Sequence, residues 1–226
     1  MREMHYHNLL TTRISRRGIL AAPFALFLVL AGCSMVDTPA PTPTQELDVR
    51  NYYIQLATPR LEYNYTVTSN APFHPPVGQL TMDMQGVEDT VNGIPVYSCL
   101  WSYGTYYGAP TAWYYGLNDS QAINLGIESA GQLTDHWVDL QAPLSKDKSW
   151  SFTSQGESIT ASILKYGATA QVNGQSYSDV IMVNYSGANG TSGTEWFQRG
   201  KGLIYYNITR PNFGTIENQL ISIVQK

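Results

Sequence analysis

Glu195 to Tyr206, with the sequence EWFQRGKGLIYY, is the stretch that decides the fold of this chain. Its Gly200-Lys201-Gly202 segment has the glycines and the basic residue of a phosphate-binding loop, and it also has the composition of a turn between two strands. A phosphate-binding loop needs a helix directly after it, because the N–H groups at the helix N-terminus hold the phosphate. The residues that follow, 203–208, are rich in aromatic and β-branched side chains, which favours a strand. We therefore predict a turn between two strands here and no nucleotide site.

Strand-like patterns extend outward from this turn. Residues 61–69 and 80–85 alternate apolar with polar side chains, as strands with one solvent-facing side do. Asn92-Gly93 and Asn173-Gly174 each lie between such runs, and Asn-Gly accepts the positive φ angles of a tight hairpin. No long stretch of residues 49–226 has the 3.6-residue period of a helix. The pattern predicts an all-β domain whose successive strands form an antiparallel meander.

The N-terminal region has the order of an export signal. Residues 1–18 carry four arginines against one acidic residue, and the apolar run that follows, 19–30, is shorter than the roughly 20 residues of a membrane span. The run ends in Leu30-Ala31-Gly32-Cys33, which resembles the lipobox of bacterial lipoproteins. The resemblance implies a signal peptide over residues 1–32, containing a signal helix, and a Cys33 that carries fatty acyl groups such as palmitate. An ordinary secretory signal with an incidental Cys33 is the alternative.

The signal also bears on export route and location. Residues 15–20 resemble the start of a twin-arginine signal, so this route and the general secretory route both stay open. Ser34 after the cysteine resembles an outer-membrane sorting signal of Gram-negative cells. We expect a protein anchored by lipid to a bacterial membrane on the extracytoplasmic side, which is the outer membrane if the cell is Gram-negative.

A segment rich in proline and threonine separates the signal from the β domain. Residues 33–48 hold the lipidated cysteine and a run that has too little apolar surface to order itself, which predicts a disordered tether. The β domain then spans residues 49–226. After cleavage before Cys33 the chain keeps nine basic and sixteen acidic residues, a formal charge of −7. The basic residues are scattered singly, so we expect a membrane as a partner through the anchor and no nucleic acid.

Four segments of the β domain carry a family resemblance. They resemble the W-[FY]-x-x-G-x-G-[LV]-[VI], P-L-x-x-G-x-x-W, F-x-D-V-[IV] and Y-[FY]-P-L motifs of a broad group of uncharacterised bacterial envelope lipoproteins. The segments are residues 196–204, residues 142–150 with Asp147 in place of glycine, residues 177–181, and residues 51–56 without the proline. That group resembles the half-open β-barrels of lipoprotein carriers. The resemblance implies a single strongly curved antiparallel sheet with a hydrophobic concave side, and a β-sandwich is the alternative.

Few residues of the mature chain suit catalysis or metal binding. Beyond Cys33 it has two histidines, His74 and His136, and one cysteine, Cys99, whereas zinc takes three or four ligands. Within Asp135-His136-Trp137-Val138-Asp139, strand alternation places the histidine on the face opposite both carboxylates, so neither orients it as a catalytic base. We predict that the domain is not an enzyme and has no catalytic residues, no metal site and no cofactor.

Aromatic residues are the remaining functional signal, with sixteen tyrosines and five tryptophans in the chain. They concentrate in residues 97–116, where alternation forms a stripe on one face of two successive strands: Tyr97, Cys99, Trp101 and Tyr103, then Trp113 and Tyr115. The stripe is compatible with core packing, with the lining of an apolar ligand site or with an exposed platform for sugar rings. Cys99 within the stripe favours an inward-facing side, because a free thiol in an oxidising envelope is safer buried.

The expected function combines these observations. We predict a membrane-anchored extracytoplasmic lipoprotein whose non-catalytic β domain binds an apolar ligand or a segment of an envelope protein. Its expected ligand-binding residues are Trp101, Tyr103, Trp113 and Tyr115. The alternative is a structural or glycan-contacting protein of the cell envelope, in which the aromatic stripe belongs to the core.

Overall fold

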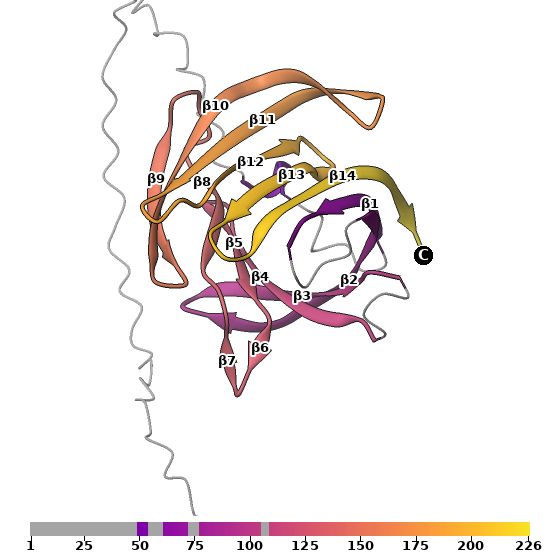
Figure 1. The fold of residues 1–226 in the computed structure, drawn as a ribbon, viewed down its shortest axis with the longest axis vertical. Helices are drawn as coiled ribbons and strands as arrows, with labels where there is room; N and C mark the ends of the chain where they lie inside the picture. The colour runs from indigo at the N-terminus through magenta and orange to yellow at the C-terminus, as the bar shows by residue number, and fades with distance from the viewer. Residues whose placement is uncertain (1–48, 54–60, 72–76, 105–108) are drawn as a thin grey trace, which may run out of the picture. The chain divides into compact units, whose positions relative to one another are not determined.

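The computed structural model describes residues 49–53, 61–71, 77–104 and 109–226. The predicted signal peptide, Cys33, the tether and His74 lie outside the described residues. The described residues form fourteen strands, one short 3₁₀ turn, η1, and no α-helix (Figure 1). This part of the chain holds no helix with the length and apolarity that crossing a membrane requires.

The elements are η1 (Val49–Asn51), β1 (Leu61–Ser69), β2 (Val77–Val91), β3 (Ile94–Ser102), β4 (Thr111–Leu117), β5 (Gln121–Gly126), β6 (Glu128–Ser129), β7 (Gln132–Leu133), β8 (Trp137–Gln141), β9 (Ser149–Ser154), β10 (Glu157–Val172), β11 (Gln175–Gly187), β12 (Ser192–Gln198), β13 (Gly202–Arg210) and β14 (Gly214–Gln225).

Twelve of the strands form one antiparallel sheet, in the order β8-β5-β4-β3-β2-β1-β14-β13-β12-β11-β10-β9. The remaining two, β6 and β7, form a small separate hairpin. Sequence neighbours are mostly sheet neighbours, as in a meander, but β1 and β14 pair in the middle of the sheet. The sheet curves until its two edges approach each other, so that it is nearly closed into a barrel (Figure 1). The prediction of a single strongly curved antiparallel sheet is confirmed, and the alternative of a sandwich is not observed.

The edges of the sheet, β8 and β9, leave a seam that no β-ladder closes. Side chains bridge it instead. The indole Nε1 of Trp150 in β9 donates a hydrogen bond to the carbonyl oxygen of Val138 in β8, at 3.0 Å. The ring of Trp137 packs edge-on against Phe152, with their centroids 5.3 Å apart. The barrel is therefore joined at the seam by aromatic packing and lacks backbone pairing there.

The turns follow the local sequence signals. Asn92-Gly93 connects β2 to β3 with φ angles of 52° and 78°, and Asn173-Gly174 connects β10 to β11 with 49° and 76°. Gly200 has a φ of 75° in the connection from β12 to β13. These left-handed backbone angles are the ones that Asn and Gly adopt at low energy. The predicted hairpins and the predicted turn at Gly200-Lys201-Gly202 are confirmed.

The core lies on the concave side of the sheet. Tyr63, Tyr65 and Val67 of β1 are fully buried there, and the alternating residues of β1 between them are more exposed. Leu80, Met82 and Met84 of β2 are buried in the same way. The period-two pattern thus directs one face of each strand inward, and burial of these large side chains contributes about 1.5–3 kcal/mol each.

The η1 turn and the two residues after it are attached to the sheet through their backbone. The N–H of Val49 donates to the carbonyl oxygen of Asp119 at 3.1 Å, and the carbonyl oxygen of Asn51 accepts from Gly200 at 2.6 Å. The side chain of Tyr53 is buried in the core, with its ring stacked on Phe197 at a centroid distance of 5.9 Å. Residues 49–53 therefore supply a core aromatic side chain that comes from none of the strands.

Candidate functional site

The aromatic stripe predicted from the sequence divides into two groups. Tyr97, Cys99 and Tyr115 are buried members of the core. Trp101, Tyr103 and Trp113 are only partly buried, and they line a cavity of about 200 Å³. Of the four predicted ligand-binding residues, three therefore lie on this cavity and Tyr115 lies deeper.

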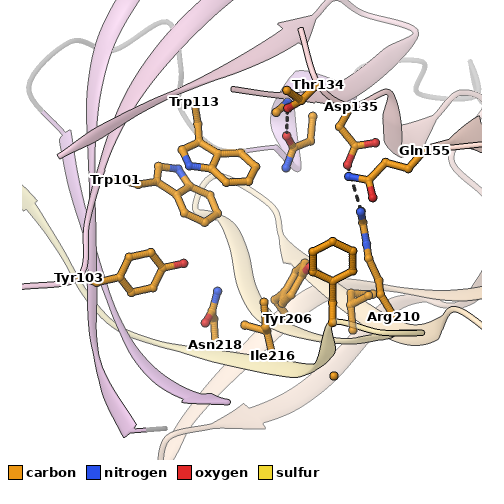
Figure 2. Close-up of a pocket in the computed structure, with 15 residues that line it drawn as sticks. Trp101, Tyr103, Trp113, Thr134, Asp135, Gln155, Tyr206, Arg210, Ile216 and Asn218 are labelled. Atoms are coloured by element: carbon orange, nitrogen blue, oxygen red, sulfur yellow. Dashed lines mark hydrogen bonds and ion pairs between the residues drawn. The ribbon is translucent and has the colours of Figure 1, made fainter. Parts of the chain in front are cut away.

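Trp101 and Trp113 form the flattest wall of this cavity. Their rings stack with centroids 4.4 Å apart and planes inclined by only 19°. The strands that carry them, β3 and β4, pair side by side and place the two indoles in adjacent positions of one face. Figure 2 shows Tyr206, Ile216 and Asn218 across the cavity from the two indoles, on β13 and β14. Aromatic and aliphatic side chains thus face each other across the cavity, and the amide of Asn218 lies in its wall.

An ion pair lies at another part of the lining, away from the indoles (Figure 2). A guanidinium nitrogen of Arg210 donates to Asp135 Oδ2 at 3.1 Å, and the hydroxyl of Ser154 donates to the other oxygen of that carboxylate. The guanidinium also lies over the ring of Trp137, 4.7 Å from its centroid. These contacts hold Arg210 in place and neutralise its charge within the cavity wall.

Residues 135–139 differ in exposure, but not by simple strand alternation, because Val138 is buried as well. Trp137 and Asp139 are buried and Asp135 lies on the cavity, whereas His136 is exposed. Asp135 accepts a hydrogen bond from the backbone N–H of His136 at 2.8 Å. Asp135 and His136 precede β8, which begins at Trp137, and the imidazole of His136 is exposed.

A buried pair of carboxyl groups lies beside the cavity, and sequence reasoning did not identify it as a site. Asp139 of β8 is 5% exposed and Glu195 of β12 is 2% exposed. The hydroxyl of Tyr53 donates to the carboxyl of Asp139. The hydroxyl of Tyr185 donates to Glu195 Oε2 at 2.7 Å and also lies 3.0 Å from the backbone oxygen of Asp139. Two tyrosines from distant parts of the chain thus fix this pair.

Burial controls the protonation of the pair. Loss of hydration, followed by repulsion from Glu195, raises the pKa of Asp139 well above its ordinary value. Burial also raises the pKa of Glu195 to about 7, although hydrogen bonds from Tyr185 and Asp139 oppose the shift. Because both pKa values are raised, the pair keeps at least one proton at neutral pH, mainly on Asp139, and Glu195 loses its proton around pH 7.

A second, smaller cavity of about 30 Å³ lies against the pair. Asp139, Glu195 and Asn218 contribute to its lining, and four residues border both cavities: Trp101, Asn124, Tyr206 and Asn218. Asn218 is 5% exposed, and its Oδ1 has no hydrogen-bond partner among the described residues. Figure 2 shows its side chain pointing into the space between Tyr103 and Tyr206. The smaller cavity therefore adjoins the larger one and lies against the carboxyl pair.

The concave side is thus less uniformly hydrophobic than the family resemblance implies. Proton retention removes at least one of the two carboxyl charges, and hydroxyl donors from Tyr53 and Tyr185 satisfy carboxyl oxygens, which makes burial of the pair tolerable. The sequence signal for this pair was an acidic residue on the apolar face of a strand. Asp139 follows Trp137 in this way, and Glu195 precedes Phe197.

Within the described residues, no three His, Cys, Asp or Glu side chains gather in a way that would hold a metal ion. Together, the curved sheet and its inner cavities define an all-β domain with a small internal site that aromatic, aliphatic and polar side chains line. The chain matches no family model, no curated protein and no solved structure.

Proposed function

We propose that this protein is a membrane-tethered binding protein whose non-catalytic β domain holds the apolar part of a small molecule. The observation that carries the proposal is the stacked wall of Trp101 and Trp113 on a cavity of about 200 Å³. Ligand sites are typically concave and lined by apolar and aromatic side chains with a few polar groups that orient the ligand. The lining has this composition, because its polar side chains lie among aromatic and aliphatic ones.

The geometry supports an enclosed ligand over an exposed sugar platform. A platform requires coplanar aromatic rings that face the solvent. Trp101 and Trp113 instead stack on each other and are partly buried, so each covers much of one face of the other.

The membrane tether is proposed from the sequence. Leu30-Ala31-Gly32-Cys33 supplies the acylation site, and two or three acyl chains anchor a protein stably because each buried methylene contributes about 0.8 kcal/mol. The Pro- and Thr-rich segment after it would hold the β domain near a membrane surface, where apolar molecules are concentrated. The proposed location is the extracytoplasmic face of a bacterial membrane.

Replacement of Cys33 by serine should release the protein from the membrane. A hydroxyl is a much weaker nucleophile than a thiol, so the variant should not receive acyl chains. Metabolic labelling with radioactive palmitate should disappear, and the protein should move to the soluble fraction. Unchanged labelling of Cys33→Ser would contradict the anchor.

Removal of the indole wall should abolish retention of the ligand. Native mass spectrometry of the protein purified from its own host should show a bound small molecule, which solvent extraction then recovers. The double variant Trp101→Ala and Trp113→Ala should lose this molecule. Trp196→Ala is a matched control, because Trp196 is also partly buried and packs on Tyr205 at 4.4 Å, yet it lies on neither cavity described above.

One pair of results would contradict the binding proposal. The wild-type protein would be purified without a bound molecule and would bind nothing from an extract of the envelope. The double variant would then lose only stability, by several kcal/mol, as truncations of large core residues do. Trp101 and Trp113 would in that case be core residues.

A further inference from the structure

We propose that the ligand carries a primary ammonium group, which enters the small inner cavity and bonds to the Asp139–Glu195 pair and to the amide oxygen of Asn218. This inference rests on the proposed function, because the apolar body of the same molecule would lie against Trp101 and Trp113. It assigns to the site a chemical class of ligand, an amine with an apolar or aromatic body.

The first observation behind the proposal is a buried pair of carboxyl groups on a cavity that no basic side chain of the described residues lines. Asp139 and Glu195 are almost fully buried, both line the small cavity, and a negative charge forms there when Glu195 loses its proton. A buried charge is unfavourable unless an opposite charge is close to it. No lysine, arginine or histidine lines the small cavity among the described residues. A cationic ligand would supply the missing charge.

The nearest described candidate for that role within the protein is Arg210, and it is already engaged. Its guanidinium pairs with Asp135 at 3.1 Å and lies over the ring of Trp137. Arg210 lines the larger cavity but does not line the smaller one. Arg210 attracts a charge on Glu195 through space and so lowers the pKa of Glu195, but its ion pair is with Asp135 and it leaves the small cavity open to a cationic ligand.

The second observation is the unsatisfied acceptor on Asn218. Its side chain is almost fully buried, and its Oδ1 accepts no hydrogen bond from the described residues. Such an atom loses its bonds to water on burial and gains none in return, which is unfavourable unless a ligand supplies a donor. An ammonium group has three N–H donors, enough for the amide oxygen and for both carboxyl groups.

Size and surroundings agree with an ammonium group. A volume of about 30 Å³ accommodates a group of the size of a water molecule or an aminomethyl end, but not a ring. The rings of Tyr65, Tyr115 and Tyr206 also line this cavity, and aromatic faces attract cations. The larger cavity shares four lining residues with it and offers space for the remainder of the molecule.

The test compares amines with neutral molecules of the same shape. The purified protein, cleared of bound molecules, is titrated with 2-phenylethylamine and with 2-phenylethanol, and with hexylamine and hexanol, by calorimetry. Each amine should bind at least about ten-fold more tightly than its alcohol, because only the amine neutralises the buried charge. Glu195→Gln should reduce this preference to about two-fold or less. Glu128→Gln, the same change at an exposed position, should leave it intact.

The possible results separate the inference from the proposed function. Equal binding of amine and alcohol to the wild-type protein would overturn the ammonium assignment and leave an apolar site. Binding of sodium or ammonium chloride alone as tightly as hexylamine would also overturn it, because the pair would then select an inorganic cation. If no probe binds and the protein from its own host carries no molecule, both proposals fail. The comparison of amines with alcohols on the wild-type protein tests the ammonium assignment even if Glu195→Gln does not fold. Asp139→Asn is a second variant, which removes the other carboxyl group of the pair.

Discussion

The protein should become less stable as the pH rises from about 4.5 to about 8, by on the order of 3 kcal/mol in its free energy of unfolding. The cause is Glu195, whose pKa rises on folding from the ordinary value of 4.5 to about 7. An acid with a raised pKa favours the folded state while it is protonated, so its contribution is complete below the ordinary pKa. The contribution is lost as the pH passes through the pKa of the folded state.

Other groups do not cancel this trend. Burial also raises the pKa of Asp139, which therefore acts in the same direction. Hydrogen bonds, chiefly from Lys226 and Thr191 respectively, lower the pKa values of Glu62 and Glu157. These two carboxylates are ionised between about pH 4.5 and 8, and their contribution to the free energy of unfolding falls only when the pH drops below about 4.5.

Urea unfolding at a series of pH values measures this effect. Glu195→Gln should reduce the slope, because glutamine does not titrate and its amide oxygen still accepts a hydrogen bond from Tyr185, which leaves Asp139 as the remaining buried acid of the pair. The exposed control Glu128→Gln should retain the slope of the wild-type protein. A wild-type profile that is flat or rises between about pH 4.5 and 8 would show that the carboxyl pair is already ionised or solvated in the folded state.

A methyl group at Gly193 should destabilise the protein by about 3 kcal/mol or more. Gly193 has a φ of 155°, and a Cβ built there would lie 2.1 Å from the carbonyl oxygen of Asn207 and 2.8 Å from the Cα of Ile208. Both are backbone atoms of β13, and Ile208 is the direct pairing partner of Gly193. The backbone therefore has to shift and disturb the ladder, since no flexible side-chain tip is available to move.

Gly86→Ala is the matched control for this prediction. Gly86 also has a positive φ, 116°, but nothing lies within 4 Å of the added Cβ. The Gly86→Ala variant should therefore lose only the stability that a side chain at positive φ costs, about 1–2 kcal/mol. Equal losses of stability for the two variants, measured from urea midpoints, would mean that β12 and β13 separate without penalty at this point.

Local sequence signals were sufficient for most of the fold. Some turns depend on backbone angles that their own residues favour, so a few neighbouring residues of the sequence were enough to predict them. These turns are the hairpins at Asn92-Gly93 and Asn173-Gly174 and the turn at Gly200. The inward face of β1 followed from simple alternation in the same way. The curvature of the sheet was expected only from the family resemblance, because it depends on the pairing of strands far apart in the chain.

The candidate site was predictable only in part, for the same reason. Alternation placed Trp101, Tyr103 and Trp113 on one face, but whether that face packs into the core or lines a cavity depends on β13 and β14 across from it. The pairing of Asp139 with Glu195 needs strands β8 and β12 and a tyrosine from residues 49–53. A sequence pattern shows each acid on an apolar face, and it carries no information about which two acids meet.

The pairing of β1 with β14 also governs how the chain can fold. Leu61 is opposite Gln225 in this ladder, so the middle of the sheet joins residues from nearly opposite ends of the β domain. Loop-closure entropy opposes such contacts, and folds rich in them have high contact order and fold slowly. A nascent chain that has completed β1 to β13 still presents both β1 and β13 as unpaired edges, which are prone to aggregate. The domain therefore gains its native sheet only when its last strand is available, and a chain exported in the unfolded state would meet this requirement on the far side of the membrane.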